Sequence, residues 1–109
     1  MRMPTAQSLF TKAIWVKMPA IGTTSELPPE KVKIVAKLFG GSGYSFYITE
    51  ANPETGEAFG WATFGQGGEL GYSDLNEIAS TRFPPFGLPV ERDRYYTPET
   101  LADVMARGH

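Results

Sequence analysis

The chain has 109 residues, a length that fits one domain with a core large enough to fold unaided. It has no cysteine and one histidine, His109, at its last position, which excludes disulfides, zinc–thiolate sites and thiol nucleophiles and leaves the body of the chain without the commonest general base. The net charge of −2 is unevenly spread, because all five lysines precede residue 40 whereas residues 41–80 hold six acids and no base.

The first candidate element lies in residues 6–17. Leu9, Phe10, Ala13 and Ile14 would share one face of a short helix, and a strand over residues 13–18 is the alternative. Recurring proline and glycine then predict a loop over residues 18–29. We leave open that residues 1–12 are flexible within a single domain of residues 1–109.

Three strands follow. Residues 32–39 alternate apolar side chains with lysines, which is typical of a half-buried strand. A glycine-rich turn leads to a second strand over residues 44–50, and residues 57–64 return as a third. We predict that the three are consecutive antiparallel strands.

The best turn signal separates the second strand from the third. It is the run Asn-Pro-Glu-Thr-Gly of residues 52–56. Pro53 presets the backbone for a type I turn, and Gly56 supplies the left-handed residue of a bulge.

A glycine-rich loop over residues 65–71 and a short helix over residues 73–80 are expected next. Ser73 or Asp74 would cap this helix. Its inward side chains would be Leu75, Ile78 and Ala79.

Two further elements are predicted after a proline-rich loop. Residues 88–96 read as a last strand, and Thr97 caps a closing helix that begins at Pro98. Its inward side chains would be Leu101, Val104 and Met105. The fold class is therefore α+β, with an antiparallel meander sheet of four to five strands and two or three short helices packed on one face.

Motifs for catalysis or phosphate binding are weak. The glycine-rich runs at residues 40–43 and 65–71 lack the strand–loop–helix context of a phosphate site, and hairpin turns explain them. Residues 58–64 resemble an aromatic RNA-binding strand, but Glu57 replaces its basic residue and the flanks are acidic. We therefore expect Phe59 and Trp61 to pack in the core.

Charged residues alternate near the end of the chain. On a strand, Glu91 and Asp93 would face one side and Arg92 the other. We predict that Arg92 is partly buried and paired with a carboxylate, with Glu69, Glu50 and Asp93 as candidates.

Several segments from residue 37 onward resemble a bacterial family known as a domain of unknown function, numbered 2958. The matching segments are Lys37-Leu-Phe39, Tyr47-Ile-Thr-Glu50, Phe59-Gly60, Glu69-Leu-Gly-Tyr72 with Leu75 and Glu77, and Gly87-Leu-Pro-Val-Glu-Arg-Asp93 with Tyr96. The resemblance implies a short cytoplasmic protein of plasmids and integrative elements, carried beside genes for conjugation or for evading host defence. It implies no reaction and no cofactor.

We therefore expect a non-enzymatic protein-binding accessory module of a mobile genetic element, with inhibition of a host defence or regulatory protein as one form. The alternative is a nucleic-acid-binding accessory protein that uses the lysine-bearing strand and the aromatic hairpin. We expect no catalytic, cofactor or metal site, and a protein partner, with the acidic segment favouring a basic one. Without an apolar run long enough for a signal peptide or a membrane span, a cytoplasmic location is expected, and the oligomeric state is left open. The partner-binding candidates are Glu69, Tyr72, Glu77, Glu91, Arg92, Asp93 and Trp61.

Overall fold

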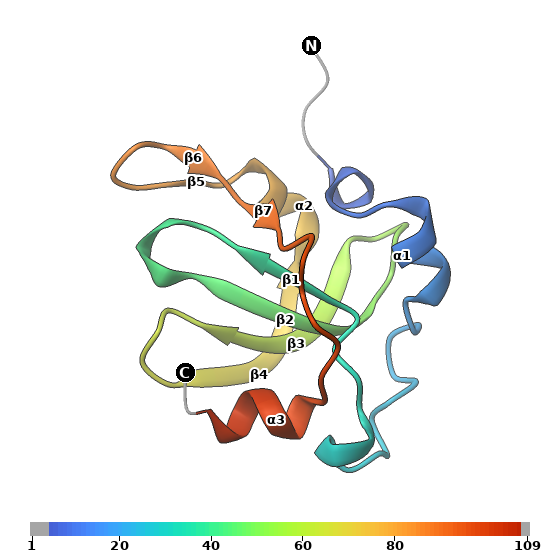
Figure 1. Cartoon of the computed structure of the whole chain (residues 1–109). Helices are drawn as coiled ribbons and strands as arrows, with labels where there is room; N and C mark the ends of the chain where they lie inside the picture. Colours follow the sequence, from blue (N-terminus) through green and yellow to red (C-terminus); the bar gives the residue numbers. More distant parts are fainter. Residues whose placement is uncertain (1–4, 108–109) are drawn as a thin grey trace.

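The computed structural model describes residues 5–107 and is built on a five-stranded antiparallel sheet in the order β4-β3-β2-β1-β7 (Figure 1). Its strands are β1 (Ala36–Phe39), β2 (Ser45–Ala51), β3 (Glu57–Thr63), β4 (Gly68–Asp74) and β7 (Glu91–Arg92). A separate two-stranded hairpin is formed by β5 (Arg82–Phe83) and β6 (Leu88–Pro89). The α+β class predicted from the sequence is confirmed.

The three predicted central strands are consecutive and antiparallel, as expected. The first is shorter than predicted. Residues 32–34 keep the predicted alternation, with Val32 and Ile34 buried, but they pair with residues 99–101 at the start of the last helix and not with β2. The Ile34 N–H donates to the Glu99 carbonyl at 2.9 Å, and the Leu101 N–H donates to the Val32 carbonyl at 2.7 Å. Alternating burial indicates extended chain but does not say which segment it pairs with. Here the pairing partner changes from residues 99–101 to β2 along the predicted strand.

The turn at residues 52–56 is confirmed. Gly56 has φ of 84°, in the left-handed region, and its N–H donates to the Asn52 carbonyl at 2.8 Å. The Asn52 side chain accepts hydrogen bonds from the N–H groups of Glu54 and Thr55, which fixes the turn.

The predicted loop at residues 65–71 is wrong for its second half. Residues 68–74 form β4, which pairs with all seven residues of β3. Its two glycines and exposed side chains carry no apolar alternation. The pairing follows from the tight return after β3, where the Thr63 hydroxyl donates to the Gly67 carbonyl at 2.6 Å.

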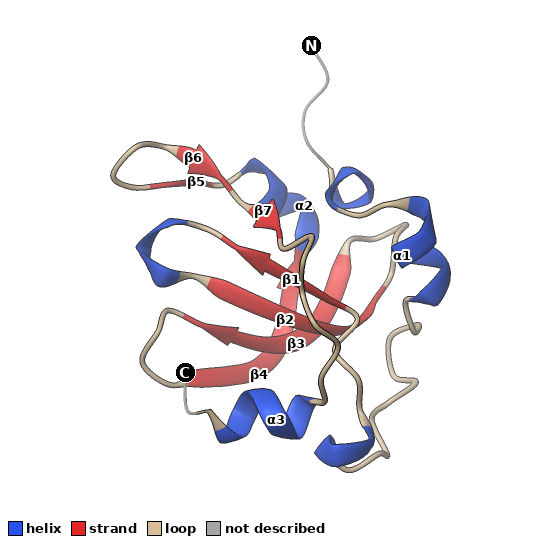
Figure 2. Cartoon of the chain, in the orientation of Figure 1, coloured by secondary structure: helices blue, strands red, loops and turns tan. Residues whose placement is uncertain are grey.

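The helices are short (Figure 2). They are α1 (Lys12–Lys17), α2 (Leu75–Ser80) and α3 (Leu101–Ala106), with 3-10 turns at Ala6–Leu9, Pro29–Lys31 and Gly41–Gly43. None of the helices in residues 5–107 is long and apolar enough to cross a membrane.

The predicted helix over residues 6–17 is interrupted, because Phe10 is extended and buried and Thr11 caps α1 anew. The alternative strand at residues 13–18 is wrong. Asp74 caps α2, one of the two predicted caps. The cap of α3 is Thr100, not Thr97, and it forms a capping box with Asp103. The predicted inward residues of α2 and α3 are buried or half-buried.

The predicted strand over residues 88–96 is also wrong. It is divided into β6, which pairs with β5, and β7, which pairs with β1. Pro89 has no N–H to continue a ladder, and the next residue, Val90, is buried in the core. The proline-rich loop predicted before it is the tip of the β5–β6 hairpin.

The sheet has a core on each face. The first contains Phe46, Ile48, Leu75 and Phe10 and is covered by the N-terminal segment and α2. The second contains Tyr47, Leu101 and Val104 and is covered by α3 (Figure 1). The expectation of helices on one face therefore holds for α1 and α2, whereas α3 covers the other. Residues 6–12, left open as flexible, contribute buried Ala6 and Phe10, while residues 1–4 and His109 lie outside the described residues.

Candidate partner-binding surface

β4 is an outer strand of the sheet, and half of its backbone groups face away from β3. The Leu75 N–H donates to the Gly56 carbonyl at 2.7 Å, which sets the phase of the β3–β4 ladder. In an antiparallel ladder, hydrogen-bonded pairs alternate with non-bonded pairs. Because Leu75 and Gly56 form a bonded pair, every second residue before Leu75 is bonded too, so Ser73 and Gly71 bond to β3. Leu70 and Tyr72 instead turn their backbone N–H and C=O groups outward. The described residues offer these outward groups no backbone partner.

The side chains of the same two residues are exposed and apolar. Leu70 is 40% exposed and Tyr72 61% exposed, and the Tyr72 ring lies 4.9 Å from the ring of Phe59. Both residues line a mostly apolar hollow of about 220 Å³. Its lining also includes the apolar residues Leu27 and Leu101 and, among its polar residues, Glu50. This apolar hollow therefore lies directly beside the open backbone of β4.

Glu50 fixes one wall of the apolar hollow. A bulge between Ile48 and Glu50 puts Glu50 opposite Phe59, on the face of α3, although the plain alternation of β2 would aim it at the first core. The residue is 2% exposed, and its carboxylate accepts hydrogen bonds from the N–H groups of Gly22 at 2.8 Å and Thr24 at 2.6 Å, and from the Thr24 hydroxyl.

These bonds also set the charge of Glu50. Burial, the largest influence, raises the pKa of its carboxyl, but the hydrogen bonds from Thr24 and Gly22 together outweigh it, and the pKa lies below its usual value. The ionised Glu50 therefore holds the loop that carries Leu27.

An acidic hollow lies on the other side of Tyr72. It has a volume of about 460 Å³ and is lined by Tyr72, Glu57 and Asp74, with Thr55 and Ser73. Glu57 and Asp74 are direct partners across the β3–β4 ladder, and like charges in that position repel. Neither carboxylate forms an ion pair with a cation of residues 5–107. Tyr72 thus separates an apolar hollow from an acidic one.

Six of the seven candidate residues fall into two groups at opposite edges of the sheet. Glu69 and Tyr72 are exposed on β4, and Glu77 is exposed on the helix that follows it. Glu91, Arg92 and Asp93 lie at or just after β7. The two groups correspond to two segments of the sequence, but their placement at opposite edges depends on the sheet order, which the sequence did not reveal.

Trp61 belongs to neither exposed edge. It is half-buried against the second core, and a Cβ at Gly68 would lie 2.5 Å from its indole ring, so Gly68 makes room for it. The expected core packing is confirmed for Trp61, while Phe59 is half-buried against Tyr72. Because α3 covers this face, the Trp61 ring is not an open platform for stacking a base.

The prediction for Arg92 is half wrong. Its side chain is partly buried, as expected, and lines a hollow of about 300 Å³ between β7 and residues 8–11. No carboxylate of residues 5–107 lies within ion-pair distance of it. Of the proposed partners, Glu50 is engaged by Thr24 and Gly22, and Asp93 accepts a hydrogen bond from the Tyr95 N–H.

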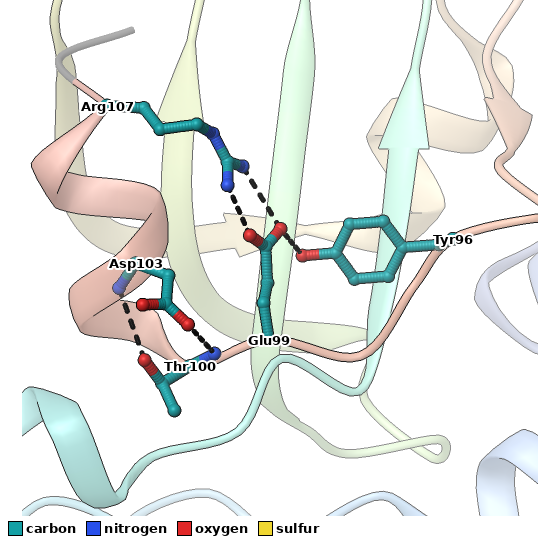
Figure 3. Close-up of polar contacts among 5 residues, drawn as sticks. All are labelled: Tyr96, Glu99, Thr100, Asp103 and Arg107. Carbon is teal, nitrogen blue, oxygen red and sulfur yellow. Dashed lines mark hydrogen bonds and ion pairs between the residues drawn. The ribbon is translucent and has the colours of Figure 1, made fainter.

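The ion pair found in the described part of the chain is Arg107–Glu99, which sequence reasoning missed (Figure 3). The guanidinium donates to both Glu99 oxygens, the Tyr96 hydroxyl donates to one of them, and Arg107 lies 5.7 Å from the centre of the Tyr47 ring. The Arg107 bonds hold the pKa of Glu99 below its usual value, while burial, followed by the bond to Glu99, raises the pKa of Tyr96. With both Glu99 oxygens engaged and the phenol protonated, the cluster fastens α3 to the sheet and is poorly suited to proton transfer.

No group of three or more histidine or carboxylate side chains in residues 5–107 is arranged to hold a metal ion. Comparison with known proteins gives one result. A family model described as a protein of unknown function (DUF2958) matches residues 9–107. No curated protein and no solved structure matches the chain.

Proposed function

The chain belongs to the DUF2958 family, and from that premise and the geometry of β4 we propose that it is a non-enzymatic protein-binding module that receives a strand of its partner along β4. The proposal depends on one observation. A seven-residue outer strand turns backbone donors and acceptors outward next to exposed Leu70 and Tyr72.

Open edges are a liability in soluble proteins, which usually shorten, cover or bulge them. A long open edge with apolar side chains therefore favours use as a docking site. In strand addition the main-chain hydrogen bonds supply affinity, and pockets for alternate side chains supply specificity. The apolar hollow beside Leu70 provides such a pocket.

The non-enzymatic part of the proposal is supported by the structural roles of three hydrogen-bonded carboxylates, those of Glu50, Glu99 and Asp103. The Glu50 carboxylate accepts hydrogen bonds that hold the loop at Gly22 and Thr24, and the Glu99 carboxylate binds Arg107 at the end of α3. Asp103 accepts the Thr100 N–H in the capping box. Each of these carboxyls has a lowered pKa, which suits a structural acceptor better than a general acid.

The partner is proposed to be a protein of the host or of the mobile element. The family resemblance implies genes for conjugation and for evading host defence nearby, so a module that occupies a partner's strand or blocks its surface could act as an inhibitor. A binding role of this kind needs only the β4 surface.

Site-specific photocrosslinking in host cells tests the proposal. The photoreactive residue p-benzoylphenylalanine replaces Tyr72 in one protein and, as a matched control, Phe86 in another. Phe86 is 80% exposed but lies at the tip of the β5–β6 hairpin. We expect discrete protein adducts from position 72 that position 86 does not give.

A second substitution, made in the position-72 protein, links the adducts to strand addition. Leu70→Pro removes an outward N–H without touching the ladder to β3, whereas Leu70→Ala keeps the N–H and removes the side chain. Adducts should disappear with proline and persist with alanine. Adducts that survive Leu70→Pro would contradict the proposal, and adducts destroyed by nuclease would favour the nucleic-acid alternative.

A further inference from the structure

The two hollows beside Tyr72 differ in charge, and this difference defines the segment that β4 can accept. Resting on the proposed strand addition, we propose that the occupant of β4 is an extended basic segment of another protein. It places a lysine or arginine at the acidic hollow and an apolar side chain at the apolar hollow.

The spacing of the hollows fits a strand. Asp74 and Leu70 lie on the same face of β4, because they are four residues apart, as are their β3 partners Glu57 and Trp61, and side chains an even number of positions apart share a face. Positions four residues apart along a strand are separated by about 13 Å. A segment paired with β4 therefore presents alternate side chains to this face, one at the acidic hollow, one beside Tyr72 and one at the apolar hollow.

The requirement for a cation follows from the Glu57–Asp74 pair. Two carboxylates opposite each other on neighbouring strands repel, and residues 41–80 contain no lysine or arginine to offset them. A cationic side chain entering the acidic hollow would be shared by both carboxylates. Electrostatic complementarity of this kind selects the partner and speeds its association more than it adds affinity.

A second copy of this chain fits the edge less well. Pairing β4 with β4 would bring two acidic strands together, each with Glu69 and Asp74 and with Glu57 beside it. Charge on an edge strand is a common device against self-association. The same charges that disfavour a dimer therefore favour a basic partner.

Peptide binding measured by fluorescence anisotropy tests the inference. The probes are two labelled peptides of seven residues, the length of β4, one alternating lysine with valine and the other alternating glutamate with valine. Each is titrated with the wild-type chain, with Leu70→Pro, and with the double variant Glu57→Gln/Asp74→Asn. Asparagine at position 74 can still cap α2. Glu91→Gln, on β7 at the opposite edge of the sheet and outside the proposed β4 surface, is the control for loss of a negative charge.

We expect the lysine peptide to bind and the glutamate peptide not to bind. The double variant should weaken lysine-peptide binding by about 5- to 10-fold, the sum of two rim ion pairs, and the Glu91→Gln control should not. Leu70→Pro should weaken it by about tenfold or more, because a main-chain bond is lost and the proline ring displaces the incoming strand.

The remaining outcomes separate the inference from the proposed function. If both peptides bind equally and both are lost with Leu70→Pro, strand addition stands and the basic partner is overturned. If the lysine peptide binds but ignores Leu70→Pro, its binding is diffuse charge attraction and the inference fails. If sedimentation shows a dimer that Leu70→Pro dissociates, the occupant is a second copy and the inference fails.

Discussion

The two outer strands of the sheet, β4 and β7, differ in length and in how far neighbouring segments flank them. β7 has two residues, begins two positions after Pro89, and lies beside the N-terminal segment, with a shared hollow lined by Phe10 and Arg92. β4 has seven residues and leaves Leu70 and Tyr72 exposed. One edge of the sheet is thus short and flanked while the other is long and open, and this contrast is the basis of the proposal that β4 is a docking edge.

The largest difference is expected between two glycines that are partners across the β3–β4 ladder. A Cβ at Gly60 would lie 2.0 Å from the Tyr47 carbonyl oxygen, whereas nothing lies within 4 Å of a Cβ at Gly71. Gly60→Ala should therefore lower the free energy of unfolding by about 3 kcal/mol, because the backbone must shift. Gly71→Ala should change it by less than about 0.5 kcal/mol. Urea denaturation measures both, and equal losses would mean that β4 is packed like an inner strand.

Proline substitution at neighbouring positions of β4 tests the phase of its hydrogen bonds. Gly71→Pro should lower the free energy of unfolding by about 2 kcal/mol, since it removes a ladder hydrogen bond and leaves a β3 carbonyl unpaired. Leu70→Pro should cost less than about 1 kcal/mol, because its N–H already faces outward. Thermal denaturation of the two variants distinguishes them, and the reverse order would place the open groups on the other residues.

The wall of the apolar hollow should depend on ionised Glu50. Glu50→Gln should lower the free energy of unfolding by about 1–2 kcal/mol, because it weakens hydrogen bonds to a charged acceptor. Glu91→Gln on β7 is an exposed control and should leave the free energy of unfolding nearly unchanged. Because folding lowers the pKa of Glu50, its contribution to stability is complete above the usual carboxyl pKa of about 4.5 and is lost as the pH falls through the lower folded value.

Denaturation of wild type and Glu50→Gln between neutral and acidic pH measures this contribution. The two curves should converge below the folded pKa of Glu50. A constant gap across the whole pH range would contradict the role of its charge.

The smallest effect is expected at the opposite edge. Arg92 has no carboxylate at ion-pair distance in the described part of the chain, so Arg92→Ala should cost less than about 1 kcal/mol, mostly through lost packing of its aliphatic stem. Arg107→Ala, which breaks the pair with Glu99, is the comparison and should lower the free energy of unfolding by about 1 kcal/mol, since the Arg107 side chain is 41% exposed. A loss of several kcal/mol at Arg92 would reveal a buried pair.

Periodicity and turn chemistry predicted much of this fold. Buried alternation located β1 to β3, the Asn52–Gly56 turn set their order, and the apolar spacing of α2 and α3 identified their inward residues. β4 was missed because an exposed edge strand with Gly68 and Gly71 has no buried face to impose a pattern.

The candidate site was only partly accessible to the same reasoning. Tyr72 and Glu69 were identified from segments shared with the family, but the apolar hollow also needs Leu27 and Leu101, which the sheet order and the last helix bring together. Glu50 reaches this face only through a bulge, which no residue pattern announces. Glu99 lies before the N-cap of α3 and Arg107 is its C-cap, so the pair is not at the spacing of neighbours on a helix and the sequence pattern did not reveal it.

Residue-resolved amide hydrogen exchange of β4 tests the central claim most directly. In the free chain the amides of Leu70 and Tyr72 should exchange rapidly and those of Gly71 and Ser73 slowly, because only the latter bond to β3. At saturating lysine–valine peptide, Leu70 and Tyr72 should become slow while Gly71 and Ser73 change little. Protection of Leu70 and Tyr72 in the free chain, or their unchanged rapid exchange when the peptide is bound, would contradict strand addition at β4.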